Sequence, residues 1–310
     1  MWGAAALSTD PWRVHAHVEV WVLVGSLVAL YAYTFRTIGP KAVPAGTPAV
    51  TRRQLAAFAA AMVLLWTASD WPIRDLADHW LVSVHLFQHM VLGYFLPPLA
   101  LLATPEWFLR LMVGGGTGYR VLRTSSRPVL AGVLFIVVVM GSHVPGVVNA
   151  TAANPVLHAA VHGLMITAAL LMSMPVCGPL PELRITRAGA MIYLFLQSVV
   201  PTVPAAWLTF AEGVVYSRYD VPERVWGISV TTDQQIAGAV LKAGGGVFLW
   251  IVVIVMFFRH FARNFGSDQS FRKLSDVQPR LPVDERGELT YERITKAFEA
   301  VPAAPHPHDV

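Results

Sequence analysis

The sequence predicts an all-α integral membrane protein, a bundle of seven transmembrane helices. Of its 310 residues, 55% are hydrophobic and only 14% are charged, whereas about 25% of the residues in a typical soluble domain are charged. The apolar residues gather into runs separated by loops that hold nearly all the Asp, Glu, Lys and Arg residues. These features exclude an ordinary globular enzyme, a nucleic-acid-binding protein and a disordered scaffold.

Seven runs are long or apolar enough to cross a bilayer, for which a helix needs about 20 residues. The second and fourth runs are short in their apolar part and borrow flanking residues. The first run is expected to stay as a helix, because only Arg13 precedes it as a basic residue and no small-x-small cleavage site follows it. The predicted spans are Val18–Phe35, Gln54–Ser69, Trp80–Ala103, Val129–Ser142, Val156–Pro175, Ala188–Phe210 and Ile236–Phe258.

The basic residues predict the orientation of the bundle. Of the 23 Lys and Arg residues, eighteen lie in alternate loops and in the C-terminal tail, four lie on the opposite side, and Lys242 lies inside the last span. Because cytoplasmic loops carry the excess of Lys and Arg, the N-terminus is predicted outside and the C-terminus in the cytoplasm. Residues 1–260 form the predicted transmembrane domain, and residues 261–310 a charged, proline-containing cytoplasmic tail that is partly disordered.

Histidines are the candidate site residues, because polar side chains inside membrane helices are costly and tend to be functional. Six of the 11 histidines lie at or inside the ends of the predicted spans, all in the outer half of the membrane. They are His79, His85, His89, His143, His158 and His162. His85 and His89, like His158 and His162, are four residues apart, so each pair presents both rings on one helix face. The third and fifth spans run in the same direction, so we expect these four rings to converge, with His79 and His143 at the rim.

Several kinds of site fit this pattern. Imidazole suits copper or zinc. Thioether sulfur favours Cu(I), but the nearby methionines Met90, Met140 and Met165 are expected to fill the core and not to bind metal. Haem held between the two pairs, or a hydrogen-bonded packing network without metal, are the alternatives. Asp78, Gln88 and Asp233 are expected to hydrogen-bond the rings from behind and fix their tautomers. For Asp233 the alternative is a helix N-cap, a role that Thr232 shares.

The sequence lacks the motifs of several other kinds of binding or catalytic site. The single cysteine, Cys177, excludes an internal disulfide framework, and no Walker sequence, dinucleotide-binding loop, nucleophile elbow or Cys-x-x-Cys-His haem attachment site occurs. No general acid or nucleophile is evident beside the histidines. The sequence therefore does not predict an enzyme.

Three stretches resemble the polytopic CtaG family of bacterial assembly factors for the caa-type cytochrome c oxidase. They are Ala77–Met90 followed by Pro97-Pro98, Asn154–His162, and Trp226-Gly227 leading to Asp233-Gln234-Gln235. The likeness covers roughly residues 15–260. It implies a multi-pass protein of the bacterial cell membrane that assembles a copper-containing oxidase, with oxidase subunits, extracytoplasmic copper chaperones and membrane lipid as partners.

Three functions remain open from the sequence. The first is an assembly factor that binds copper transiently and delivers it to the oxidase. The second is a b-type cytochrome in which the histidine pairs ligate haem. The third is a metal-ion transporter, which the sequence supports least, because the inner halves of the spans carry almost no polar residue besides Lys242.

Overall fold

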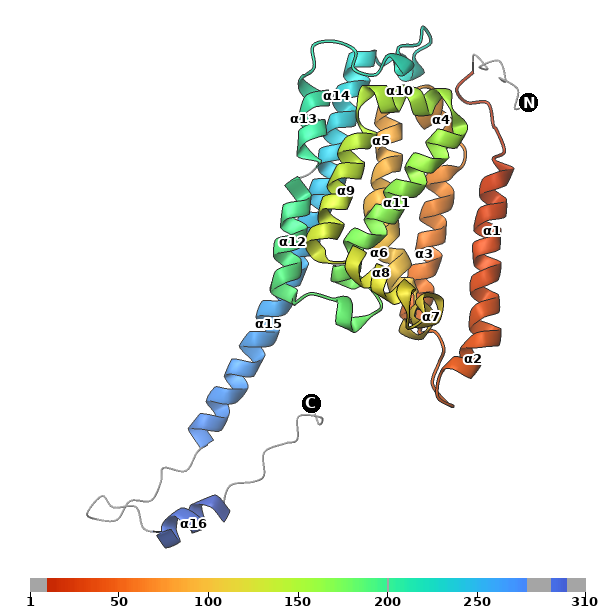
Figure 1. Cartoon of the computed structure of the whole chain (residues 1–310). Helices are drawn as coiled ribbons and strands as arrows, with labels where there is room; N and C mark the ends of the chain where they lie inside the picture. The colour runs from red at the N-terminus through yellow and green to blue at the C-terminus, as the bar shows by residue number, and fades with distance from the viewer. Residues whose placement is uncertain (1–9, 200, 278–290, 300–310) are drawn as a thin grey trace. The chain divides into compact units, whose positions relative to one another are not determined.

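The computed structural model of the chain describes residues 10–199, 201–277 and 291–299, and most of these residues are helical. No strand occurs within these ranges, which confirms the all-α prediction. Contacts between residues divide the chain into two compact units, residues 1–254 and 255–310. All the predicted site residues belong to the first unit, which is shown with the rest of the chain in Figure 1.

Short and long helices alternate along the first unit. Its α-helices are α1 (Val18–Tyr33), α2 (Gly39–Ala42), α3 (Arg52–Ser69), α4 (Ile73–His79), α5 (Val82–Met90), α6 (Leu96–Ala103), α7 (Glu106–Val113), α8 (Thr117–Ser125), α9 (Pro128–Ser142), α10 (Pro145–Ala153), α11 (Pro155–Cys177), α12 (Arg187–Val199), α13 (Thr202–Phe210) and α14 (Val230–Leu241). Three π-helical segments join successive α-helices without a loop, namely η1 (Thr34–Ile38), η2 (Val91–Phe95) and η6 (Lys242–Val247). Three short 3₁₀ turns are η3 (Pro181–Leu183), η4 (Ser217–Tyr219) and η5 (Val225–Gly227).

Helix α15 (Phe248–Val277) begins in the first unit and continues into the second, where α16 (Tyr291–Glu299) follows. Residues 261–277 of the predicted tail are thus helical. Residues 278–290 and 300–310, which the disorder prediction also covers, lie outside the described residues.

Five of the described helical stretches are long and apolar enough to cross a membrane. They are Val18–Ala42, Val82–Ala103, Pro155–Cys177, Arg187–Phe210 and Val230–Ala262. Two further pairs of helices are each bent at a short break, α3 with α4 by 44° and α8 with α9 by 72°. Each predicted span falls on one of these stretches or bent pairs, so the described part of the chain contains five spans, or seven if each bent pair crosses as one.

Side-chain caps explain where three of the helices begin. Thr51 caps α3 and, with Gln54, forms a reciprocal capping box. The Asn154 side chain accepts the N–H groups of Val156 and Leu157 at the start of α11. Ser229 caps α14 by accepting the N–H of Thr232 at 3.1 Å. The prediction that Thr232 or Asp233 caps this helix is therefore wrong, because α14 begins at Val230, earlier than either residue allows.

The π-helical segments lie beside residues that a regular α-helix tolerates poorly. Segment η2 directly precedes Pro97 and Pro98, which lack the N–H that an α-helix needs. Segment η6 contains the glycine triplet 244–246. A Cβ atom on Gly245 would lie 3.1 Å from Pro201 Cγ and 3.2 Å from Tyr94 Cζ. Glycine there allows η6 to pack closely against its neighbours.

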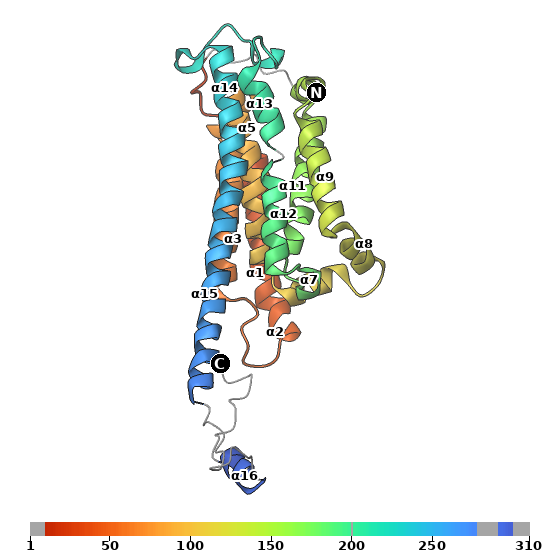
Figure 2. The ribbon, with the colours of Figure 1, turned by 90° about the vertical axis from the view of Figure 1, so that its left-hand side faces the viewer.

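Helices α5 and α6 form the centre of the bundle. In the most apolar window of the Val82–Ala103 stretch 67% of the residues are buried, against 11% for Val18–Ala42 at the periphery. Helix α5 packs against α4 and α14, and α11 packs against α6 and α9; Figure 2 shows α14 running beside α5. Large apolar side chains such as Val22 and Val129 are exposed on the outer flanks, as expected for helices that face lipid.

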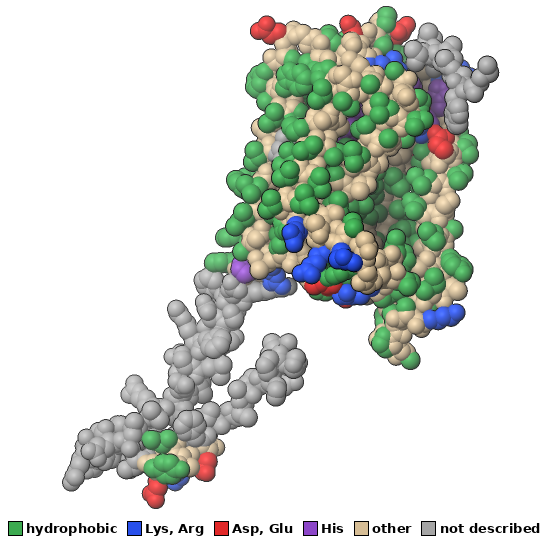
Figure 3. Space-filling view, viewed as in Figure 1, with side chains coloured by type: hydrophobic (Ala, Val, Ile, Leu, Met, Phe, Trp, Pro, Cys, Tyr) green, Lys and Arg blue, Asp and Glu red, His purple; other side chains and the backbone are tan. Residues whose placement is uncertain are grey.

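Charged side chains separate toward the two ends of the bundle. Figure 3 shows Lys and Arg gathered at the end where α7 and α8 lie, whereas most Asp and Glu side chains lie at the other end and the flank between is largely apolar. Lys242 is exposed and its Nζ donates to Thr202 Oγ1 at 2.5 Å. The hydroxyl of the neighbouring helix thus supplies a polar partner for this ammonium group.

Candidate functional site

A polar cavity of about 370 Å³ lies at the acidic end of the bundle. Helices α3, α4, α5, α10 and α11 and the 3₁₀ turn η4 contribute to its walls. Its lining residues are Ser69, Arg74, Asp78, His79, His85, Gln88, Val148, Thr151, Pro155, His158, Ala159, His162 and Tyr219. Four of the six predicted histidines therefore face one cavity.

The two histidine pairs meet at the inner wall of this cavity. The ring centroid of His85 lies 6.2 Å from those of His158 and His162, and the ring centroid of His89 lies 4.9 Å from that of His162. Within the pairs, the centroids are 4.3 Å apart on both α5 and α11. The spacing of four residues thus brings four imidazoles from two helices together.

One ring nitrogen of His162 contacts ring nitrogens of two other histidines. His162 Nε2 lies 3.1 Å from His89 Nε2 and 2.9 Å from His158 Nε2. A neutral imidazole has a single N–H, so His162 Nε2 accepts from both rings only if its own proton is on Nδ1. In that arrangement His89 Nδ1 is an acceptor, and it is buried without a hydrogen-bond partner among the described residues.

The remaining two predicted histidines lie on opposite sides of this group. His79 lines the cavity, and its Nδ1 lies 3.1 Å from Arg218 Nη2. His143 is only 3% exposed and its ring centroid lies 5.7 Å from that of His89. Because His143 Nδ1 contacts the carbonyl oxygen of Val139 at 2.6 Å, its Nε2 is left as a buried acceptor without a partner among the described residues. The sequence predicts His143 at the rim of the cluster. The structure instead places it behind the cluster.

Of the three side chains expected behind the histidines, only Asp78 lies near one. Its Oδ1 is 4.0 Å from His158 Nδ1, and its Oδ2 is 3.5 Å from Arg74 Nε. The Gln88 amide donates instead to the carbonyl oxygen of Ala68 at 2.8 Å, which ties α5 to α3. Gln88 therefore fixes the helix that carries two histidines, and not a ring tautomer.

Asp233 caps a helix other than its own. Its carboxylate accepts the N–H of Val82 at 2.7 Å and that of Ser83 at 3.1 Å, together with the Ser83 hydroxyl. These N–H groups belong to the first turn of α5, whose N-cap residue, Leu81, has no side-chain acceptor. The negative charge also suits a helix N-terminus. Asp233 thus positions His85 and His89 through the backbone of α5, without touching either ring.

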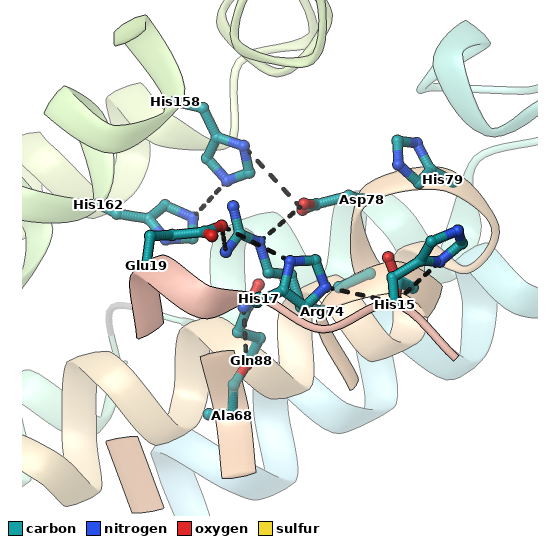
Figure 4. Close-up of polar contacts among 12 residues, drawn as sticks. His15, His17, Glu19, Ala68, Arg74, Asp78, His79, Gln88, His158 and His162 are labelled. Atoms are coloured by element: carbon teal, nitrogen blue, oxygen red, sulfur yellow. Dashed lines mark hydrogen bonds and ion pairs between the residues drawn. The ribbon is translucent and has the colours of Figure 1, made fainter. Parts of the chain in front are cut away.

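A chain of ion pairs that the sequence did not predict borders the cavity (Figure 4). Arg74 Nη1 contacts Glu19 Oε1 at 2.8 Å, and Arg74 also faces Asp78 on its own helix. His17 contacts both Glu19 and Asp75, and His15 contacts Asp75. These two histidines precede α1 and have no helical periodicity. In the sequence, only their position outside the first predicted span, on the same side of the membrane as Asp75 and Asp78, could have indicated these contacts.

Tyr219 closes another part of the wall. Burial raises the pKa of its phenol well above the ordinary value, and nearby Asp78 adds to this effect. The phenol therefore keeps its proton at physiological pH, and it donates to the carbonyl oxygen of Ala77 at 2.8 Å. Among the residues that the structure describes, no three His, Cys, Asp or Glu side chains are already spaced to enclose one metal ion.

Comparison with known families identifies the chain. The model of the cytochrome c oxidase caa3 assembly factors (Caa3_CtaG) matches residues 7–263. The chain belongs to this family. The match confirms the predicted CtaG resemblance and includes the whole histidine cavity. Neither a curated protein nor a solved structure matches the chain. Membership in the Caa3_CtaG family supports a membrane protein that acts in the assembly of an oxidase.

Proposed function

We propose that this Caa3_CtaG-family protein binds copper in its histidine cavity and transfers it to a subunit of the oxidase that it helps to assemble. His85, His89, His158 and His162 would hold the ion as cargo, with His79 and His143 on either side. No substrate is converted, since the role is to hold and release an ion. The observation that carries the proposal is the contact of His162 Nε2 with the Nε2 atoms of both His89 and His158.

The chemistry of the cavity suits a cation bound by nitrogen. Ligand nitrogens about 2.0–2.1 Å from a metal ion lie about 2.9–3.4 Å from one another, and the two Nε2 separations at His162 are 3.1 and 2.9 Å. Buried acceptors without partners cost about 1–3 kcal/mol each, and His89 Nδ1 and His143 Nε2 are such atoms among the described residues. An ion bound at the Nε2 atoms would replace the present contacts between these rings, with the proton of His89 then on Nδ1.

The location suits delivery to the outer face of a bacterial cell membrane. The excess of Lys and Arg at the end with α7 and α8 supports a cytoplasmic location for that end, so the cavity opens toward the outside. The partners would be oxidase subunits that receive the metal and extracytoplasmic copper chaperones that supply it.

The geometry favours copper over haem. An iron held between two axial histidines separates their ligating nitrogens by about 4 Å, with the macrocycle lying between the rings. His89 Nε2 and His162 Nε2 are closer than this, at 3.1 Å. Transport is disfavoured because α5 and η2 continue inward from the cavity through buried apolar residues such as Met90 and Leu92.

Complementation of a strain that lacks the protein tests the proposal. We expect the wild-type chain to restore oxidase activity and oxidase copper content under limiting copper. The His158→Ala/His162→Ala variant should accumulate in the membrane and restore neither. His260→Ala removes a histidine of α15 that does not line the cavity, and it should behave as wild type. Full restoration by the double variant would refute the proposed role of the cavity.

A further inference from the structure

Two histidines and two carboxylates lie close together at the acidic end of the bundle, apart from the residues that line the cavity. The segment before α1 carries His15 and His17 (Figure 4). Both contact Asp75, which lies in the first turn of α4. His15 Nδ1 is 3.6 Å and His17 Nε2 is 3.3 Å from the same atom, Asp75 Oδ2. Two imidazole nitrogens therefore share one carboxylate oxygen.

These two separations are close to edges of a metal coordination polyhedron, although His15, His17 and Asp75 are not spaced to enclose an ion without a movement of one of them. Nitrogen and oxygen ligands bound at about 2.0–2.2 Å in a tetrahedron lie about 3.3–3.5 Å apart. The His17–Asp75 separation of 3.3 Å agrees with this value, and the His15–Asp75 separation of 3.6 Å is slightly longer and too long for a good hydrogen bond. The His15 side chain is 47% exposed, so it has room to move the small distance that would complete the site.

The far nitrogen of His17 has a carboxylate partner. Glu19 Oε1 lies 3.6 Å from His17 Nδ1, whereas Nε2 of the same ring faces Asp75. Metal-bound histidines commonly present one nitrogen to the ion and the other to a carboxylate, which sets the tautomer and increases ligand basicity. Arg74 holds Glu19 in place through a contact of 2.8 Å.

The charge at Asp75 also favours a cation. Its side chain is only 12% exposed, and a buried carboxylate is costly unless a positive charge or hydrogen bonds compensate it. Among the described residues its ion-pair partners are the two histidines, and neither Lys nor Arg contacts it. A divalent ion would supply the missing positive charge and leave both imidazoles neutral.

We propose that His15, His17 and Asp75 form an outer site for a divalent late first-row transition-metal ion, such as Cu²⁺ or Zn²⁺, with Glu19 as the carboxylate behind His17. Two imidazoles and one carboxylate are a ligand set that these ions accept. This outer site stands on its own residues and does not depend on copper binding in the cavity.

The test is titration of the purified full chain with Cu²⁺ alone, in the His158→Ala/His162→Ala background, which lacks two of the four proposed cavity ligands. We expect an electron paramagnetic resonance signal with coupling to two imidazole nitrogens. His17→Ala should remove this signal and weaken binding by at least about 100-fold, and His15→Ala by about 10-fold or more, because each removes a direct ligand. Glu19→Gln leaves the ligands in place and should weaken binding by about 10–100-fold.

Glu212→Gln, a change of an exposed acidic residue in an outer loop, is the matched control and should leave binding unchanged. Metal-free thermal unfolding must be similar for the His15→Ala variant and its parent, so that lost binding is separated from lost folding. Unchanged Cu²⁺ affinity and spectrum after His17→Ala would overturn the outer site. A lower thermal stability of His17→Ala without any change in Cu²⁺ binding would also overturn the outer site, since it would show that the His17–Asp75 contact is only structural. Because His17→Ala leaves all the cavity histidines unchanged, either result leaves the cavity proposal to be judged by its own test.

Discussion

Removing the carboxylate of Asp233 should strongly destabilise the protein, because this side chain caps α5 from a position 151 residues away in sequence. It is 3% exposed and accepts two N–H groups and one hydroxyl. Asp233→Ala would leave the N–H groups of Val82 and Ser83 unpaired in a buried region, at about 1–3 kcal/mol each. Loss of the Ser83 hydroxyl contact adds to this, so we expect a total loss of about 3–5 kcal/mol in the free energy of unfolding. Asp233→Asn keeps one acceptor oxygen and should cost about 1–2 kcal/mol.

The assay is reversible unfolding of the purified protein in mixed detergent and sodium dodecyl sulfate, followed by helical circular dichroism. Asp220→Ala is the matched control. It removes an exposed carboxylate that pairs with Arg224 across 2.9 Å, and it should change the free energy of unfolding by less than about 1 kcal/mol. If Asp233→Ala also changes it by less than 1 kcal/mol, the inferred cap contributes nothing, and the reasoning about how α5 is positioned fails.

Three further predictions concern packing, topology and the cluster. Gly238→Ala would place a Cβ atom 2.6 Å from the Ala205 carbonyl oxygen, so it should lower the free energy of unfolding by about 2–3 kcal/mol in the same assay. A Cβ atom on Gly163 would meet no atom within 4 Å, so Gly163→Ala is the control and should cost nothing. Equal effects of the two substitutions would contradict the close contact of α13 with α14. A reporter fused after Val310 should be active in the cytoplasm, because the excess of basic residues places that end inside, and activity of a periplasmic reporter there would reverse the topology. His143→Phe fills a similar volume but removes the nitrogen that hydrogen-bonds to the Val139 carbonyl oxygen. Because His143 only borders the proposed site, this change should lower copper affinity about 10-fold or less. Complete loss of binding would show instead that His143 is a direct ligand.

Local patterns in the sequence predicted the spans and the main features of the site. Hydropathy placed each predicted span on an observed helix or bent pair, because burial in lipid demands long apolar runs. The four-residue spacing of His85 with His89 and of His158 with His162 placed each pair on one helix face, and the common direction of the two helices brought the pairs together.

The missed features depend on contacts that are distant in sequence. Asp233 resembles a cap for its own helix, and only the packing of α14 against α5 reveals which helix it caps. His15 and His17 lie in a segment without regular secondary structure, so neither periodicity nor hydropathy indicated their contact with Asp75, about 60 residues away. The π-helical segments likewise depend on how Pro97, Pro98 and the glycine triplet pack.

Copper binding by the purified protein tests the central claim most directly. Under reducing conditions, the wild-type chain should bind one Cu(I) ion tightly in the cavity, with an X-ray absorption spectrum dominated by imidazole nitrogen. The His158→Ala/His162→Ala variant should lose this ion while remaining folded, and His260→Ala should retain it. If the double variant binds Cu(I) with the same stoichiometry, affinity and spectrum as the wild type, the histidine cavity is not the copper site.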